Sequence, residues 1–113
     1  MKTLSGLKIN DQQALKEFYN RLQGLLGDRL SSTRLFGSKA KGTDETDSDI
    51  DIFVVVKRLD FTAKSKILGL AFDVNLKYGV YVSPRIVPFE LFQDTAFHST
   101  PFVRNVEKEG VLL

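Results

Sequence analysis

Cysteine is absent from this sequence of 113 residues, and histidine occurs once, as His98. Without cysteine the chain has no disulfide framework, no thiolate zinc site and no cysteine nucleophile. A single histidine also excludes a histidine-rich metal centre. The sequence therefore lacks the residues of the commonest thiol and imidazole sites.

Long apolar segments are also missing. The longest runs cover residues 52–56 and 67–72, whereas a helix that spans a bilayer needs roughly 20 apolar residues. Residues 1–6 contain no uninterrupted apolar core of the kind found in signal peptides. We therefore expect a cytoplasmic protein that does not contact a membrane.

The charge is nearly balanced, with 16 Lys and Arg against 14 Asp and Glu and a net charge of +2. This is far from the basic surplus of a protein that coats nucleic acid, so we expect no direct nucleic-acid contact. With 42% hydrophobic residues, including 9 Phe, a chain of this length can bury a core without disulfides. We expect one domain over residues 1–113.

The pattern of apolar residues predicts helices and strands in alternation. The first helix is expected between an N-cap at Asn10, with Gln13 completing a capping box, and Gly27. Further helices are expected over residues 60–77, 88–93 and 101–109, and strands over 30–36, 49–56 and 80–87. The third strand is expected to be interrupted or bulged near Ser83-Pro84, because proline has no N–H for the ladder. This order indicates an α/β (α+β) domain with a small mixed sheet flanked by helices.

The segment after the first strand has the parts of a phosphate-binding loop. Gly37 allows a ligand to approach the backbone closely, and a helical turn beginning at Ser38 would direct free amides and a hydroxyl at an anion. Lys39 and Lys41 add positive charge, and Gly42 lets the chain turn back. These five residues are therefore candidate nucleotide-binding residues.

Two acids, Asp49 and Asp51, begin the next strand. Because side chains alternate along a strand, these two positions share one face. Neighbouring carboxylates repel each other unless a cation lies between them, and Mg²⁺ typically binds one or two carboxylates together with substrate phosphates. The loop and the acids come from consecutive strands, so we predict that they face each other. Asp49 and Asp51 are the candidate metal ligands and catalytic residues of a site for a metal–nucleoside triphosphate complex.

Two other motifs with similar spacing do not fit. A P-loop needs lysine after its second glycine, but Thr43 follows Gly42. An EF-hand loop would need glycine at Ile52 and a bidentate glutamate at Arg58. A third alternative, a solvated acidic loop, does not explain why polar side chains share an otherwise apolar strand, a placement that costs desolvation free energy.

The pair Gly37-Ser38, followed after ten residues by Asp49-Ile50-Asp51, resembles the signature of the DNA polymerase β-like nucleotidyltransferase superfamily. The short chain is similar to its minimal nucleotidyltransferase (MNT) branch, and the resemblance covers residues 12–87. It implies a mixed sheet flanked by helices and Mg²⁺-dependent transfer of a nucleoside monophosphate, usually AMP from ATP, to a hydroxyl group. In this family the residues that match Gly37 and Ser38 hold the triphosphate, and those that match Asp49 and Asp51 bind metal ions.

The resemblance also implies a partner. Minimal nucleotidyltransferases often act as antitoxins of a helical HEPN-domain RNase toxin, and some attach AMP to a tyrosine of that partner. We therefore expect an Mg²⁺- and ATP-dependent enzyme of a HEPN/MNT toxin–antitoxin pair. The acceptor group and the formation of a homo-oligomer stay open.

The sequence departs from the family pattern at the third strand. A third carboxylate on a later strand normally completes a two-metal site and takes the proton of the attacking hydroxyl, but residues 80–87 contain no acid. Asp73 comes too early and Glu90 too late to be a strong substitute. Lys41 also stands where the family commonly has arginine, which removes a bidentate fork. The alternative function is therefore a catalytically weak nucleotide-binding module that regulates a HEPN-type partner by direct binding.

Overall fold

The computed structural model describes residues 7–37 and 49–113. The elements follow in the order α1 (Ile9–Leu26), the 3-10 helix η2 (Gly27–Arg29), β1 (Leu30–Phe36), β2 (Ile50–Val56), α3 (Phe61–Tyr78), β3 (Val82–Pro88), α4 (Phe89–Gln93), α5 (Thr95–His98), α6 (Pro101–Glu109) and β4 (Val111–Leu112). Among the helices of these two ranges, none combines the length and the apolar character needed to cross a bilayer.

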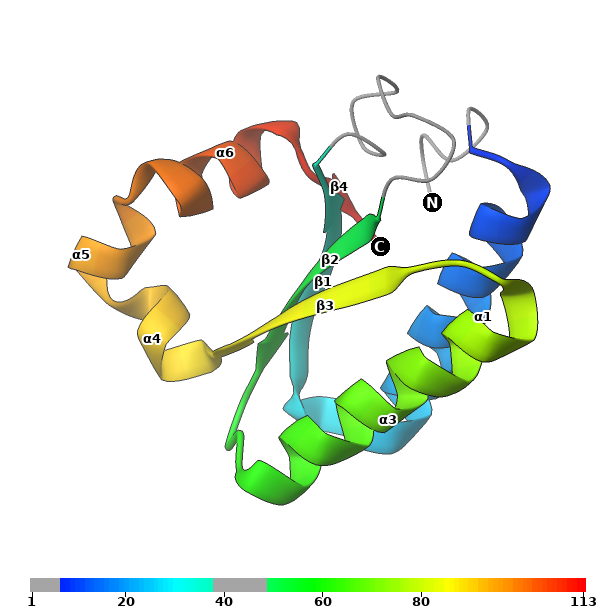
Figure 1. The fold of residues 1–113 in the computed structure, drawn as a ribbon. Coiled ribbons are helices and arrows are strands. Elements are labelled where there is room, and N and C mark those ends of the chain that lie inside the picture. The colour runs from blue at the N-terminus through cyan, green and yellow to red at the C-terminus, as the bar shows by residue number, and fades with distance from the viewer. Residues whose placement is uncertain (1–6, 38–48) are drawn as a thin grey trace.

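The four strands form one mixed sheet in the order β3-β2-β1-β4. Strand β2 runs antiparallel to β1 and parallel to β3, and β4 runs antiparallel to β1. Helices α1 and α3 lie on one face of the sheet, while α4, α5 and α6 form an arch on the other (Figure 1). The mixed sheet flanked by helices confirms the predicted fold class.

Strand β2 is the buried centre of the sheet. Its residues Ile50, Ile52 and Val54 pack into the core formed with α1 and α3. Phe53 and Val55 point to the opposite face and belong to a second core with α6. Because both faces of β2 are covered, the strand is a nearly continuous apolar run, as the sequence predicted.

The start of α1 differs from the prediction. The helix begins at Ile9, its N-cap is Lys8, and no side chain caps it. Asn10 lies inside the first turn, where its amide donates a hydrogen bond to the carbonyl of Tyr78 at 3.3 Å. The prediction of Asn10 as N-cap is therefore wrong, because its side chain joins α1 to the end of α3 instead.

Strand β3 continues through Pro84, contrary to the predicted interruption. Within the described part of the chain, β3 lies at the edge of the sheet with β2 as its neighbour, so a residue without an N–H is tolerated on its outer side. The side chain of Asn75 on α3 binds the first residue of the strand. It accepts a hydrogen bond from the Val82 N–H at 2.6 Å and donates one to the Val82 carbonyl at 3.2 Å. This clamp fixes the position of β3 beside β2.

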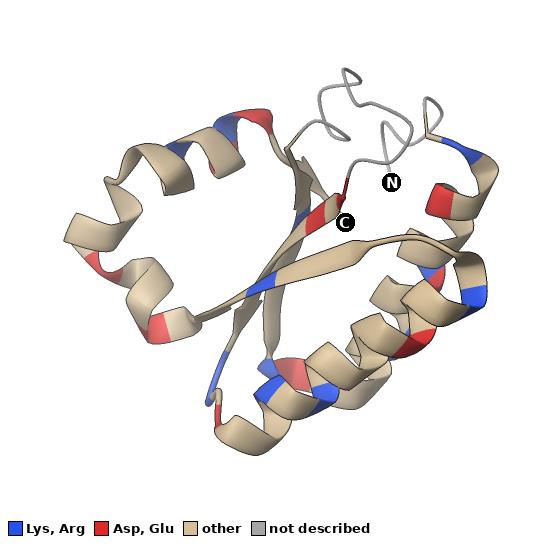
Figure 2. Ribbon diagram, viewed as in Figure 1, with Lys and Arg blue, Asp and Glu red and all other residues tan. Residues whose placement is uncertain are grey.

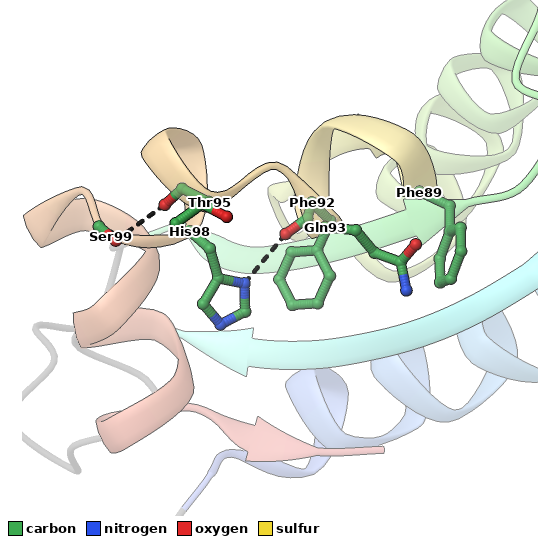
Figure 3. Close-up of a pocket in the computed structure, with 6 residues that line it drawn as sticks. All are labelled: Phe89, Phe92, Gln93, Thr95, His98 and Ser99. Atoms are coloured by element: carbon green, nitrogen blue, oxygen red, sulfur yellow. Dashed lines mark hydrogen bonds between the residues drawn. The ribbon is translucent and has the colours of Figure 1, made fainter.

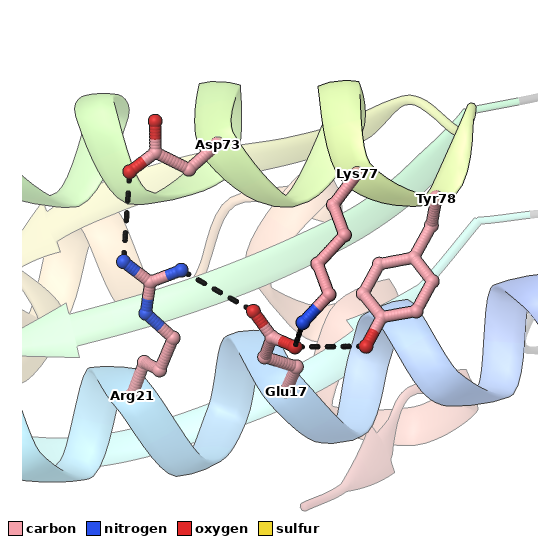
Figure 4. Close-up of polar contacts among 5 residues, drawn as sticks. All are labelled: Glu17, Arg21, Asp73, Lys77 and Tyr78. Atoms are coloured by element: carbon pink, nitrogen blue, oxygen red, sulfur yellow. Dashed lines mark hydrogen bonds and ion pairs between the residues drawn. The ribbon is translucent and has the colours of Figure 1, made fainter.

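A polar network joins the outer surfaces of α1 and α3 (Figure 4). One carboxylate oxygen of Glu17 lies 2.7 Å from the Lys77 Nζ and accepts a hydrogen bond from the Tyr78 hydroxyl at 2.8 Å. Arg21 contacts the other Glu17 oxygen at 3.3 Å and Asp73 at 3.5 Å. The hydrogen bond from Lys77, followed by that from Tyr78, lowers the pKa of Glu17 from 4.5 to about 2.

We predict that this network makes stability depend on acid pH. The folded-state pKa of Glu17 lies below its unfolded value, so the stabilisation is present above pH 4.5 and is lost as the pH falls to about 2. Glu17→Gln should therefore lower the melting temperature at pH 7, and this difference should disappear near pH 2. Thermal melts across this range test it, with the exposed Glu90, changed to Gln, as control. A Glu17→Gln deficit that stays constant down to pH 2 would contradict the prediction.

Candidate active site

The two predicted acids lie together at the start of β2. Asp49 immediately precedes the strand and is exposed, and Asp51 is its second residue and is half-buried. Asp51 alternates with Ile50 and Ile52, which point into the core of α1 and α3, so its carboxylate lies on the face of the arch. Figure 2 shows the acidic start of β2 and, further along the neighbouring strand β3, a basic band.

The electrostatics of Asp51 show that the acids act on each other. Burial raises the pKa of Asp51 first, and the charge of Asp49 raises it further, while Arg85 opposes both effects. Two carboxylates that share a partly desolvated place are stabilised by a cation between them. Their oxygen atoms are the ligands that Mg²⁺ prefers, so the pair fits a divalent ion.

The end of β1 lies against the acids. Phe36 is the register partner of Asp51, and the next residue, Gly37, has a positive φ of 77°. A methyl group on Gly37 would lie 2.6 Å from Oδ2 of Asp51, so glycine leaves room for this carboxylate. The structure thus brings Gly37 together with Asp51. The remaining predicted loop residues, Ser38, Lys39, Lys41 and Gly42, lie outside the described residues.

Aromatic side chains form the floor beside the acids. The ring of Phe102 on α6 lies 5.7 Å from that of Phe36 and 5.9 Å from that of Phe53, centroid to centroid. A shallow hollow of about 180 Å³ opens next to Gly37 and is bordered by Phe36, Phe102, Asn105, Val106 and Glu109. The acids therefore stand at the margin of an apolar surface, which lowers the local dielectric constant and strengthens charge interactions there.

Neither weak candidate for a third carboxylate reaches the pair. Asp73 lies on α3 and pairs with Arg21, on the other side of the sheet. Glu90 lies on α4, which follows the C-terminal end of β3, and this end adjoins the far end of β2 because the two strands are parallel. Within residues 7–37 and 49–113, no group of three acidic, histidine or cysteine side chains has the geometry of a metal site.

His98 belongs to a different part of the molecule (Figure 3). It ends α5, and its Nδ1 lies 2.9 Å from the Phe92 carbonyl while its Nε2 lies 2.7 Å from a Glu107 oxygen. It borders a pocket of about 580 Å³ whose other residues come from α4, α5 and the turn after them. The histidine thus ties α4, α5 and α6 together, away from the acid pair.

Arg85 on β3 is a residue near the acids that the sequence pattern did not single out. Its guanidinium carbon lies 5.3 Å from the centroid of the Phe102 ring. Alternation provided a signal, because Val87 belongs to the core under the arch and Arg85 lies two residues before it. Phe102 gave no such signal, since only the folded chain brings α6 to β1.

Comparison with known sequences identifies the family of the chain. The family model described as "Nucleotidyltransferase domain" matches residues 15–113. Two candidate protein adenylyltransferases of Methanocaldococcus jannaschii are similar along nearly their whole length. One is 34% identical over 88% of this chain and 94% of its own. The other is 37% identical over 93% of this chain and 99% of its own.

Comparison with solved structures gives the same result. A toxin–antitoxin structure with AMP-PNP matches with a TM-score of 0.54 and 26% identity, over 84% of this chain and 68% of that one. A mutant of the toxin–antitoxin complex MntA–HpeT matches with a TM-score of 0.52 and 25% identity, over 94% and 72%. By its sequence and its fold, the chain belongs to the nucleotidyltransferase domain family, as a minimal nucleotidyltransferase with the polymerase β-like fold.

Proposed function

We propose that this protein transfers AMP from ATP to a hydroxyl group of a partner protein, as the antitoxin of a toxin–antitoxin pair. The observation that carries the proposal is the contact between Gly37 and Asp51, since it joins the start of the predicted phosphate loop to the acid pair. Two relatives are named as candidate protein adenylyltransferases. The solved structures are toxin–antitoxin assemblies, one of them with an ATP analogue.

The chemistry requires one bond to form and one to break. The oxygen of the acceptor hydroxyl attacks the α-phosphorus of ATP, the bond from this phosphorus to the bridging oxygen breaks, and pyrophosphate leaves with the electron pair. The hydroxyl proton passes to solvent. Positioning and charge stabilisation supply most of the acceleration in such a transfer. The protein therefore has to bind the triphosphate and orient it, which are the roles we assign to the loop and the acids.

The acid pair fits a magnesium ion. Asp49 and Asp51 would hold it, since their mutual repulsion and the partial burial of Asp51 both favour a bound cation. Mg²⁺ in such a position neutralises phosphate charge and favours departure of pyrophosphate. Gly37 keeps the space at the Asp51 carboxylate open, and we assign Ser38, Lys39, Lys41 and Gly42 to the phosphates.

For the partner we propose a helical HEPN-domain protein, as the family resemblance implies. The similar solved structures are toxin–antitoxin assemblies, which supports a toxin as partner. A second function, a nucleotide-binding module that restrains its partner by contact alone, is favoured by one observation. No third carboxylate joins Asp49 and Asp51 within the described ranges. The described residues therefore offer the hydroxyl proton no carboxylate besides the two proposed metal ligands.

Transfer of an α-phosphate label separates the two functions. With Mg²⁺ and a candidate HEPN-domain partner, we expect label from [α-³²P]ATP to move to the partner and label from [γ-³²P]ATP to stay behind. Asp49→Asn should reduce the transfer on the order of 100-fold. A bound metal ion lowers the barrier by several kcal/mol, and loss of a metal ligand removes part of this stabilisation. Asp73→Asn is the matched control, since Asp73 lies on α3 and pairs with Arg21. Undiminished transfer in Asp49→Asn would contradict the role assigned to the acid pair, and tight partner binding without any transfer in the wild type would favour the module.

A pair of glycine variants tests the space at Asp51. Gly37 and Gly79 both have positive φ, 77° and 63°, so each change to alanine should cost about 1–2 kcal/mol of unfolding free energy. A methyl group on Gly79 meets nothing within 4 Å, whereas one on Gly37 displaces the Asp51 carboxylate. We therefore expect Gly37→Ala alone to weaken Mg²⁺·ATP binding, measured by calorimetry. Equal nucleotide affinity in the two variants would contradict the role of this contact.

A further inference from the structure

The neighbour of the acids on β3 is a serine followed by an arginine. In the parallel register, Asp51 is opposite Ser83 and Phe53 is opposite Arg85. Val87 lies on the same face as Phe53, in the core under the arch, so alternation places Ser83 and Arg85 on that face too. Both residues are exposed. The position on β3 nearest to Asp51 therefore holds a neutral side chain, with a cation two residues further along.

The Arg85 guanidinium lies over an aromatic ring. Its central carbon lies 5.3 Å from the Phe102 ring centroid, and this ring packs against Phe36 and Phe53. Such a cation–π contact favours certain orientations of the guanidinium and leaves its N–H groups able to donate hydrogen bonds in the guanidinium plane. The charge also reaches the acids, since Arg85 favours the ionised form of Asp51. The arginine is thus a cation at the border of the acid pair.

Arg85 does not serve as an ordinary salt-bridge partner. Over the two described ranges, no carboxylate lies within 4.0 Å of its guanidinium, and no hydrogen bond to it is found there. Asp51 is opposite Ser83, two residues before Arg85 on β3. The guanidinium N–H groups are therefore available to an anionic group that binds beside the acids.

The charges suggest which group this is. A site with three carboxylates and two divalent ions presents a formal charge of about +1 to a nucleotide. Two carboxylates, one divalent ion and one guanidinium present the same charge of about +1. A planar guanidinium also binds phosphate oxygens in a bidentate manner. With serine in place of a third carboxylate, the charge of Arg85 therefore replaces the net charge that a second divalent ion and its carboxylate would bring.

We propose that Arg85 binds the phosphates of the nucleotide and that the site operates with one divalent ion, the guanidinium taking the place of a second. The inference rests on the proposed function, because it assumes that a nucleoside triphosphate binds beside Asp49 and Asp51. Arg85 is then a phosphate-binding residue that contributes no covalent step. Ser83 marks the position from which a third carboxylate is missing.

Counting bound Mn²⁺ by electron paramagnetic resonance, with AMP-PNP as the nucleotide, tests the stoichiometry. We expect one Mn²⁺ per chain in the wild type and two in Ser83→Asp, because the new carboxylate would face Asp51 across the register. Two ions in the wild-type chain would overturn the proposal. A wild-type chain that binds no nucleotide would contradict the proposed function itself, and the inference with it.

Calorimetry of AMP-PNP binding with Mg²⁺ tests the arginine. Arg85→Ala should weaken binding about 10- to 100-fold, as expected for a lost charge-assisted hydrogen bond, and Arg85→Lys should recover part of the loss. The number of bound metal ions should not change in either variant. Arg104→Ala is the control, because Arg104 is an exposed arginine of the same arch on α6. Equal affinities of Arg85→Ala and Arg104→Ala would overturn the role of Arg85.

Discussion

Repulsion between two neighbouring carboxylates is the constraint on which the site depends. Asp49 and Asp51 stand at the start of the central strand, where partial burial of Asp51 adds to the effect of the second charge. Such a pair costs free energy in an empty protein and gains it when a cation is bound. The repulsion between the two carboxylates therefore favours binding of a positively charged ligand. A metal–nucleotide complex satisfies it, because the ion meets the acids and the phosphates meet the surrounding donors.

Packing on both faces of β2 holds the acid pair in place. Strand β2 is covered on one face by α1 and α3 and on the other by the arch of α4, α5 and α6 (Figure 1), so the backbone that carries Asp51 cannot move away from the charge. Asn75 fixes β3 beside it, and Phe53, one of the fully buried residues, anchors the aromatic floor. Gly37 completes the arrangement by leaving space where any other residue would displace the carboxylate.

Local patterns predicted most of the fold and part of the site. Periodicity predicted the long helices and the three long strands, and the spacing of Asp49 and Asp51 singled them out as candidate metal ligands. Patterns failed where tertiary contacts decide: Asn10 binds the end of α3 rather than capping its own helix, and Pro84 is tolerated because β3 lies at the edge of the described sheet. Strand β4 has two residues, too few for any periodicity. The place of Arg85 depends on its packing against Phe102, which lies on a helix distant in sequence.

We expect the Gly37 turn and the acid pair to bind the same metal–nucleotide complex. Crystals grown with Mn²⁺ and AMP-PNP test it most directly, because the anomalous signal of manganese locates the ion without reference to any assumed role. We predict a peak bonded to carboxylate oxygens of Asp49 and Asp51 and to phosphate oxygens that lie beside Gly37. Manganese away from these two acids, or a triphosphate seated elsewhere on the chain, would contradict the account.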